Sequence, residues 1–254
     1  MIALCDAPRA LQLGFQDPSS PLCAALIALH HEIAYILLFM LSLVSYMLIR
    51  LLLAGAPVLS TAGYSKPAYF NEHTLLELLW TLLPSIALLL IALPSFSLLY
   101  GIDHVGLPAL TIKAIGNQWY WAYEYADLAA AINGHIAVSP LQLDSYMLPV
   151  ETLALGALRL LEADNALVIP TLCNIRLLVS SADVLHSFAM PSMAIKCDAI
   201  PGRINQAALY ALRAGIYYGQ CSEICGLQHG FMPIVLESSH VAEFRSWCVS
   251  LMAA

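Results

Sequence analysis

Two long apolar runs lie within the first hundred residues of the chain. No charged residue occurs from Ile33 to Ile49 or from Leu78 to Ile102. A helix that crosses a hydrocarbon core of about 30 Å needs about 20 mostly apolar residues, so both runs are long enough. The alternative is a pair of buried helices in a soluble core. Because both runs are apolar on every face, we predict two transmembrane helices.

The segment between the two runs, from Ala54 to His73, contains two glycines and two prolines. It predicts a short loop, so the two helices form a hairpin with both flanks on one side of the membrane. Arg50 and Lys66 mark the loop as the inner side. We therefore expect an N-terminal tail over residues 1–23 on the outer side, a transmembrane hairpin over residues 24–103, and a larger domain outside.

Beyond Asp103 the pattern changes to short β-like stretches separated by Gly, Pro, Asn and Asp. They are Leu110–Ile115, Trp119–Tyr125, Ala166–Ile169, Asn174–Ser181, Ile204–Tyr210, Ile216–Tyr218 and Ile234–Leu236. Many short strands at this spacing predict a sandwich or barrel. The last stretch, Val241 to Leu251, has apolar residues at helical spacing and predicts a closing amphipathic helix. The outer domain is thus expected to span residues 104–254.

Composition narrows the class of protein. Of the 254 residues, 60% are hydrophobic and 11% are charged, whereas an average soluble protein has about 25% charged residues. The net charge is −7 with ten Lys and Arg residues, so the chain lacks the basic footprint of a nucleic-acid-binding protein. The N-terminus lacks the pattern of a secretory signal peptide. We therefore expect the mitochondrial inner membrane rather than a bacterial plasma membrane.

A cysteine–histidine–methionine cluster lies near the C-terminus. Cys221 and Cys225 stand four residues apart, His229 follows four residues later, and Met232 three later. Thiolate, imidazole and thioether are soft ligands that suit copper, whereas zinc sites use Cys, His and carboxylate. His186 follows a predicted strand and is the best candidate for a second imidazole. The residues alone leave open a Cys221–Cys225 disulfide or a structural zinc site.

The segment Cys221–Met232 resembles the binuclear copper loop of subunit II of haem–copper cytochrome c oxidases. Further blocks of the chain resemble the same family in the same order. These blocks are Trp80–Pro84, Gln118–Trp121, Asp144–Met147, Asp183–Phe188 and Lys196–Arg203. The resemblance implies a membrane α-helical hairpin followed by an all-β domain, a cupredoxin-like Greek-key β-sandwich outside the membrane.

The resemblance also implies a binuclear copper A centre. Cys221 and Cys225 would bridge two copper ions as thiolates, while His186 and His229 would each bind one of them. Met232 would be a weak ligand of one copper ion.

Glu223 would have two roles by the same resemblance. Its backbone carbonyl would bind the other copper ion, and its carboxylate would bind magnesium shared with subunit I. A carboxylate is a suitable hard ligand for magnesium. The alternative is a surface glutamate that the loop merely carries.

Two further residues gain a role from the resemblance. Trp119 resembles the exposed tryptophan at which electrons enter from cytochrome c, although a strand of large packing residues is the plainer interpretation. Glu77, three residues before Trp80, matches the glutamate at the entrance of a proton channel into subunit I. Its alternative is a carboxylate favoured by the dipole of a helix N-terminus.

Acidic residues are expected to attract a basic cytochrome c, since complementary charge speeds encounter. The candidates are Glu124, Asp127, Asp144, Glu162, Asp164 and Asp183. Ala129, Ala130 and Ala182 stand where family members are commonly acidic, so the charge contribution to docking is expected to be weaker.

The resemblance as a whole predicts the subunit of cytochrome c oxidase at which electrons enter. It would accept electrons from cytochrome c and pass them to haem-bearing subunit I, which reduces oxygen and pumps protons within a complex of several subunits in membrane lipid. The alternative from another class is a membrane-tethered copper-binding or copper-delivery protein. A quinol-oxidising relative, whose subunit II lacks copper, is disfavoured by the complete set of five candidate ligand side chains.

Overall fold

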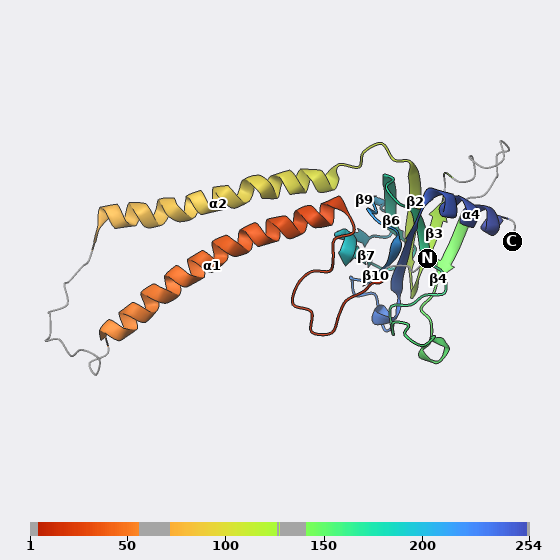
Figure 1. The fold of residues 1–254 in the computed structure, drawn as a ribbon, viewed down its shortest axis with the longest axis horizontal. Coiled ribbons are helices and arrows are strands. Elements are labelled where there is room, and N and C mark those ends of the chain that lie inside the picture. Colours follow the sequence, from red (N-terminus) through yellow and green to blue (C-terminus); the bar gives the residue numbers. More distant parts are fainter. Residues whose placement is uncertain (1–4, 56–71, 126, 128–140, 253–254) are drawn as a thin grey trace. The chain divides into compact units, whose positions relative to one another are not determined.

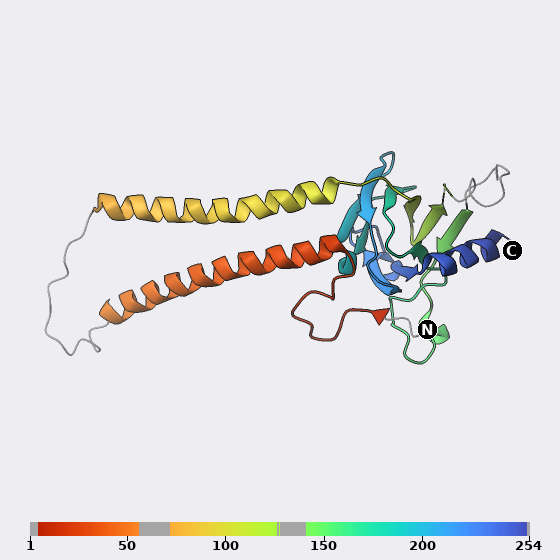
Figure 2. The ribbon, with the colours of Figure 1, turned by 45° about the horizontal axis from the view of Figure 1, so that its top comes forward.

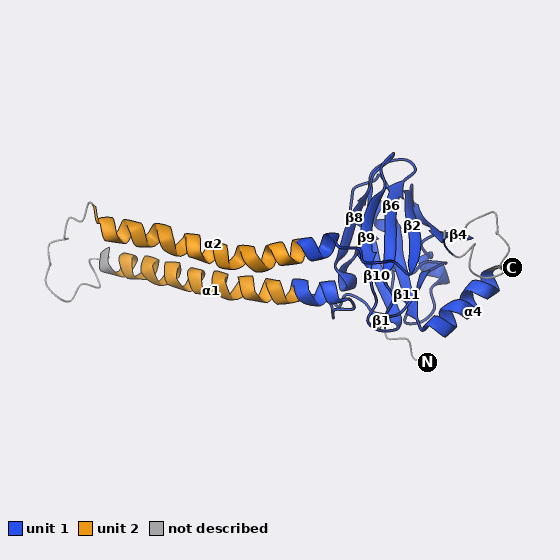
Figure 3. Cartoon of the chain, turned by 90° about the horizontal axis from the view of Figure 1, so that it is seen from above, with its two compact units in different colours: residues 1–26, 100–254 blue, residues 27–99 orange. Residues whose placement is uncertain are grey.

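The computed structural model describes residues 5–55, 72–125, 127 and 141–252. The chain divides into two compact units, one with the residues up to 26 and from 100 onward, the other with residues 27–99 (Figure 3). Lys66, Ala129 and Ala130 lie outside the described residues, as does most of the predicted loop from Ala54 to His73.

Two long helices carry the apolar runs (Figure 1). Helix α1 spans Pro21–Gly55 and helix α2 spans Thr74–Asp103, with 35 and 30 residues. Both are long and apolar enough to cross a membrane, with mean hydropathies of 2.4 and 2.2 over their candidate spans. In a soluble core such residues would be buried, yet none in either apolar window is buried. The two predicted helices are confirmed, and their exposed apolar surfaces suit lipid.

Helix α1 begins well before its charge-free run because Ser20 caps it. The backbone N–H of Cys23 donates to Ser20 Oγ over 3.0 Å, which satisfies one of the free donors at a helix start. Pro21 occupies the first helical position, where a missing N–H is tolerated. Pro84 and Pro94 lie inside α2 without ending it, as membrane helices allow.

Two β-sheets make up most of the rest of the described chain (Figure 2). One has strand order β5-β11-β10-β7-β8, with β1 also paired to β10, and the other has order β4-β3-β2-β6-β9. The strands are β1 (Cys5–Asp6), β2 (Leu110–Asn117), β3 (Tyr120–Tyr125), β4 (Leu141–Ser145), β5 (Leu167–Pro170), β6 (Ile175–Ser181), β7 (His186–Met190), β8 (Ile195–Ala199), β9 (Asn205–Leu209), β10 (Gly215–Cys221) and β11 (Pro233–Ser239). Short 3₁₀ turns are η1 (Val150–Thr152), η2 (Pro191–Met193) and η3 (His229–Phe231).

The hydrophobic core joins residues of both sheets. β6 alternates buried Ile175, Leu177 and Val179 with half-buried neighbours, which is the period of two that a strand imposes. Phe188 and Leu236 join the same cluster from the other sheet. Sheet neighbours such as β2 and β6 are far apart in the chain, as in Greek-key sandwiches. The predicted β-sandwich is confirmed.

Helix α4 (Val241–Met252) follows the last strand, as predicted. Phe244 and Cys248 are buried, and Trp247 packs edge to face on Tyr125 with ring centroids 5.5 Å apart. Val241, which the helical spacing assigns to the same face, is exposed. It is the first residue of the helix and precedes the turn that packs on the sandwich.

The N-terminal tail packs against the β domain. β1 runs parallel to β10, and Arg213 forms a salt bridge of 2.7 Å with Asp6. Just before α1, Ser19 Oγ donates to the carbonyl of Ser192 over 2.7 Å. The tail therefore belongs to the same unit as the sandwich.

Candidate metal centre

Strand pairing brings the candidate ligands together. His186 opens β7 and Cys221 closes β10, and these two strands are antiparallel neighbours in which Cys221 faces Phe188. The chain then forms a loop that ends at Met232, directly before β11. The register of β7 and β10 thus fixes two ligand positions on rigid backbone, and the loop supplies the others.

Five sulfur and nitrogen atoms converge in this region. The sulfur atoms of Cys221 and Cys225 lie 4.0 Å apart, and His186 Nδ1 lies 3.9 Å from the Cys221 sulfur. The Cys225 sulfur lies 3.7 Å from His229 Nδ1 and 3.6 Å from Met232 Sδ. Four of the five residues are buried, and His229 is half-buried. This enclosed set of soft donors fits copper.

The two cysteines are free thiols with opposite tendencies to ionise. Burial acts to raise the pKa of Cys221, but hydrogen bonds with the His186 side chain and the Ser187 backbone outweigh it and lower that pKa. Burial and the neighbouring charge of Cys221 raise the pKa of Cys225. A cation bound by both sulfur atoms would offset the repulsion between the two thiolates.

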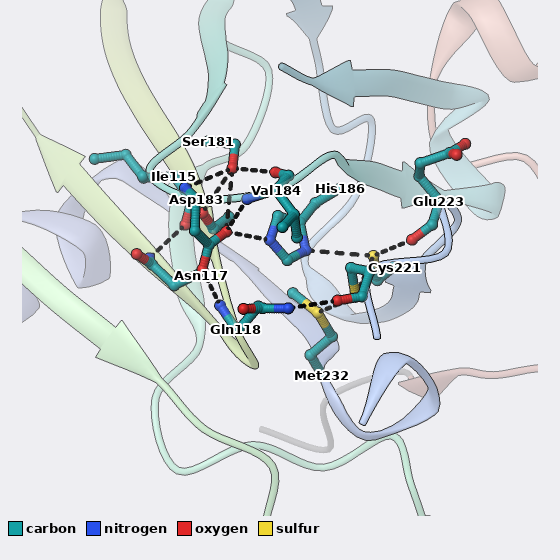
Figure 4. A network of polar contacts seen from close by, with 12 residues as sticks. Ile115, Asn117, Gln118, Ser181, Asp183, Val184, His186, Cys221, Glu223 and Met232 are labelled. Atoms are coloured by element: carbon teal, nitrogen blue, oxygen red, sulfur yellow. Dashed lines mark hydrogen bonds and ion pairs between the residues drawn. The ribbon is translucent and has the colours of Figure 1, made fainter. Parts of the chain in front are cut away.

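Asp183 fixes the imidazole of His186. Asp183 Oδ1 lies 2.8 Å from His186 Nε2 and accepts a hydrogen bond of 2.6 Å from the Val184 backbone, while its Oδ2 accepts one of 2.7 Å from the Gln118 backbone (Figure 4). Partial burial acts to raise the pKa of the Asp183 carboxyl, but these bonds hold it below its usual range. With Nε2 engaged, Nδ1 is the nitrogen left facing Cys221.

The contacts of Asp183 differ from the sequence-based interpretation. The sequence treats Asp183 only as a surface charge for docking, whereas its carboxylate is engaged with His186. The missed signal is its position three residues before a candidate ligand, because metal-binding histidines usually pair with a carboxylate or carbonyl. Gly116 was also missed, although a Cβ there would lie only 2.8 Å from the His186 ring.

Trp119 lies beside the loop Cys221–Met232, which carries most of the candidate ligands. Its ring is half-buried and packs against the core, and its atoms Cζ2 and Nε1 border Gly226, the residue after Cys225. Tyr120 stacks on Tyr146 with ring centroids 4.4 Å apart. Trp119 is thus next to the loop Cys221–Met232. Tyr120 has the packing contact of an ordinary strand residue.

Glu223 directs its backbone toward the candidate ligands. Its carbonyl oxygen accepts a contact of 3.3 Å from the Cys221 sulfur, whereas its carboxylate points away from that sulfur (Figure 4). The two groups of this residue therefore face different surroundings.

Glu77 lies in the other unit, in the first turn of α2. The backbone N–H of His73 donates to Glu77 Oε1 over 3.3 Å. This contact belongs to the helix-capping interpretation and is compatible with any further role of the carboxylate.

Most of the acidic docking candidates already have partners within the β domain. Glu124 pairs with Lys113 at 3.2 Å, and Asp127 accepts a hydrogen bond of 2.6 Å from the Thr111 backbone. Glu162 and Asp164 accept bonds from their own loop. The salt bridge with Lys113 offsets the charge of Glu124, whereas the backbone donors leave the charges of Asp127, Glu162 and Asp164 in place.

Comparison with known proteins follows the same division of the chain. The family model for the periplasmic domain of cytochrome c oxidase subunit II matches residues 110–239, and that for its transmembrane domain matches residues 8–98. Cytochrome c oxidase subunit 2 of Oenothera berteroana is 48% identical over 254 residues, covering 98% of this chain and 94% of that protein. The chain belongs to the cytochrome c oxidase subunit II family.

Two further relatives extend this assignment of subunit II. The crystal structure of the periplasmic domain of subunit II of cytochrome oxidase from Bradyrhizobium japonicum is 41% identical, with a TM-score of 0.51, and covers 59% of this chain and 98% of that one. The mitochondrial cytochrome c oxidase subunit 2 of Vigna unguiculata is 49% identical over 247 residues, covering 97% of this chain and 63% of that protein.

These likenesses confirm the cupredoxin-like sandwich and the resemblance drawn from the motifs. This subunit II is part of the multi-subunit cytochrome c oxidase and a multi-pass protein of the mitochondrial inner membrane, with a soluble copper domain.

Proposed function

We propose that this subunit II accepts electrons from cytochrome c at a binuclear copper A centre and passes them to haem-bearing subunit I. The observation that carries the proposal is the convergence of five soft donor atoms, from His186, Cys221, Cys225, His229 and Met232, in one enclosed cluster. Two copper ions held by two thiolates can share a single electron, so the bound centre supplies one-electron transfer.

The residues around the cluster would keep the ligands still while an electron arrives and leaves. The Cys221 and Cys225 thiolates would bridge the two ions, with one imidazole on each. Asp183 orients His186 through Nε2, and strands β7 and β10 hold the first two ligands on a rigid sheet. Fixed ligands in a dry site change little between charge states, which favours fast transfer.

Glu223 would complete the copper ligands with its backbone carbonyl. Its nearness to the Cys221 sulfur supports this role. We propose that its carboxylate binds magnesium shared with subunit I. That carboxylate points away from the Cys221 sulfur (Figure 4), which leaves it free of the copper ligands to bind another metal ion.

Trp119 would receive electrons from cytochrome c, since its ring adjoins the residue after a ligand. Glu77 would be the entrance of a proton channel into subunit I, because ionisable groups in membrane segments often mark proton paths. The tail over residues 1–23 and the domain over residues 104–254 would share the outer side, with the hairpin over residues 24–103 between them. The contacts of β1 and Ser19 with the sandwich support that arrangement.

A copper-delivery protein, the alternative function, needs ligands that exchange with a partner. His186, Cys225 and Met232 are each at most 3% exposed. Such burial slows exchange and favours a resident centre over cargo.

The test uses the full chain in detergent, loaded with copper. We expect two copper ions per chain and an electron paramagnetic resonance spectrum in which one unpaired electron is shared by two copper nuclei. Cys225→Ser should abolish that spectrum. Cys173→Ser, which removes another free thiol, is the control and should keep it. One copper ion per chain with a single-nucleus pattern would overturn the binuclear proposal.

A further inference from the structure

Gln118 contacts both halves of the candidate metal centre. Its backbone N–H donates to Asp183 Oδ2 over 2.7 Å, and Asp183 in turn holds His186. Its side-chain Nε2 donates to the backbone carbonyl of Cys225 over 2.8 Å (Figure 4). Gln118, which lies just before β3, therefore links Asp183, the residue that holds His186, to the loop Cys221–Met232.

Gly226 is the residue of the loop Cys221–Met232 that faces Gln118 and Trp119. A Cβ at Gly226 would lie 3.2 Å from Gln118 Nε2, 3.2 Å from Trp119 Cζ2 and 3.3 Å from Trp119 Nε1. The φ of Gly226 is 127°, a conformation that side-chain-bearing residues rarely adopt. Glycine thus allows the loop backbone to approach the indole closely.

The indole of Trp119 forms no hydrogen bond with any residue that the structure describes, although its Nε1 is buried. Its position therefore depends on packing, and its neighbour across the gap is a glycine with no side chain to pack. The hydrogen bond from Gln118 to the Cys225 carbonyl is a directional contact between this turn and the residue next to the ring.

We propose that Gln118 is a positioning residue for electron transfer, whose side chain holds the Cys225–Gly226 turn against the indole of Trp119. This inference rests on the proposed function, in which electrons enter at Trp119. In that function one electron would leave reduced cytochrome c and pass through the indole toward the ligand Cys225, and no bond would form or break. The electron crosses from the indole to Gly226, whose backbone leads directly to the ligand Cys225. Widening the gap between the indole and Gly226 weakens the electronic coupling without changing the donor or the ligands.

The experiment uses the assembled oxidase with Gln118→Met, which keeps the length of the side chain and removes its donor. Gln118→Ala is a second variant, and Gln206→Ala is the matched control, because Gln206 is an exposed glutamine on β9. Copper content, the paramagnetic resonance spectrum and the dissociation constant for cytochrome c should match the control. The rate of electron transfer within the preformed complex should fall by about tenfold or more, the scale set by small misplacements of reacting groups.

A second readout needs no metal and no turnover. In the copper-free full chain, acrylamide quenching of Trp119 is taken as the difference between each variant and the same variant carrying Trp119→Phe. Loss of the Gln118 hydrogen bond should free the turn and increase that quenching, while Gln206→Ala should leave it unchanged.

The outcomes separate this inference from the proposed function. If Trp119→Phe slows transfer but both Gln118 variants transfer at the control rate, the positioning role is wrong and Trp119 remains the site of electron transfer from cytochrome c. If the Gln118 variants lose copper or alter its spectrum, Gln118 supports the loop Cys221–Met232 itself and the positioning role is again overturned. If Trp119→Phe transfers electrons at the normal rate, the proposed function fails at that residue.

Discussion

The contact between Asp183 and His186 shows how one residue acts through another at this centre. A histidine ring can offer either nitrogen to a metal, and the choice depends on what the other nitrogen binds. Asp183 Oδ1 engages Nε2 at 2.8 Å, so Nδ1 faces the sulfur of Cys221. The motif identifies His186 as a ligand candidate, but its orientation follows from a fold that brings Gln118 and Val184 onto the same carboxylate.

Asp183→Asn should weaken copper binding while leaving the fold intact. Asparagine keeps the size of the side chain but loses the charge that makes the imidazole a stronger ligand. Loss of such outer partners typically costs about 10- to 100-fold in metal affinity. Copper affinity is measured by competition with a chelator on the full chain. Asp144→Asn, which changes an acidic residue of β4, is the control, and equal affinities in both variants would contradict the role of Asp183.

The sequence pattern located long strands with alternating burial, whereas it missed the five-residue strands β4, β7 and β8. β6 has the pattern that a half-buried strand requires, and the sequence locates it well. β7 is buried throughout and begins with His186 and Ser187, so it has no polar face to mark it. β8 alternates exposed Lys196 and Asp198 with buried or half-buried residues, but its five residues are too few for the pattern to stand out. The sequence therefore predicted the candidate ligands of the centre but missed β7, the strand that begins with His186.

Tyr125 links the two sheets through its hydroxyl. Tyr125 on β3 donates to the carbonyl of Val168 on β5 and accepts from the N–H of the same residue, both at 2.9 Å. Tyr125→Phe should leave two buried backbone groups unpaired, at a cost of about 1–3 kcal/mol of unfolding free energy. Urea unfolding of the copper-free chain, followed by near-ultraviolet circular dichroism, measures this loss. Tyr210→Phe, at a half-buried tyrosine, is the control. If Tyr125→Phe lowers the free energy of unfolding no more than this control does, the hydrogen bonds with Val168 do not stabilise the contact between the sheets.

Over the whole molecule, features that depend on contact with lipid are easier to predict from sequence than features that depend on a distant strand. Lipid requires long runs that are apolar on every side, so α1 and α2 are visible in the sequence without any knowledge of their neighbours. The tail gives no such signal, because β1 has two residues and depends on β10, more than two hundred positions later. Glu77 differs from the tail, because the sequence alone places it at the start of a membrane helix. Its contact with His73 fits the helix cap, and a substitution separates that role from proton transfer.

Glu77→Gln should slow turnover of the assembled oxidase severalfold without altering copper. The glutamine oxygen can still accept the hydrogen bond from the His73 backbone, so the capping contact is kept while the acidic group is removed. A proton path that begins at this residue would then be interrupted at the membrane edge. Oxygen consumption and proton uptake are measured together with the copper spectrum, and Glu72→Gln, on an exposed neighbour, is the control. Normal turnover in Glu77→Gln would contradict the proton-channel role and leave Glu77 with helix capping alone. Capping needs only a hydrogen-bond acceptor, whereas a proton path needs an acid.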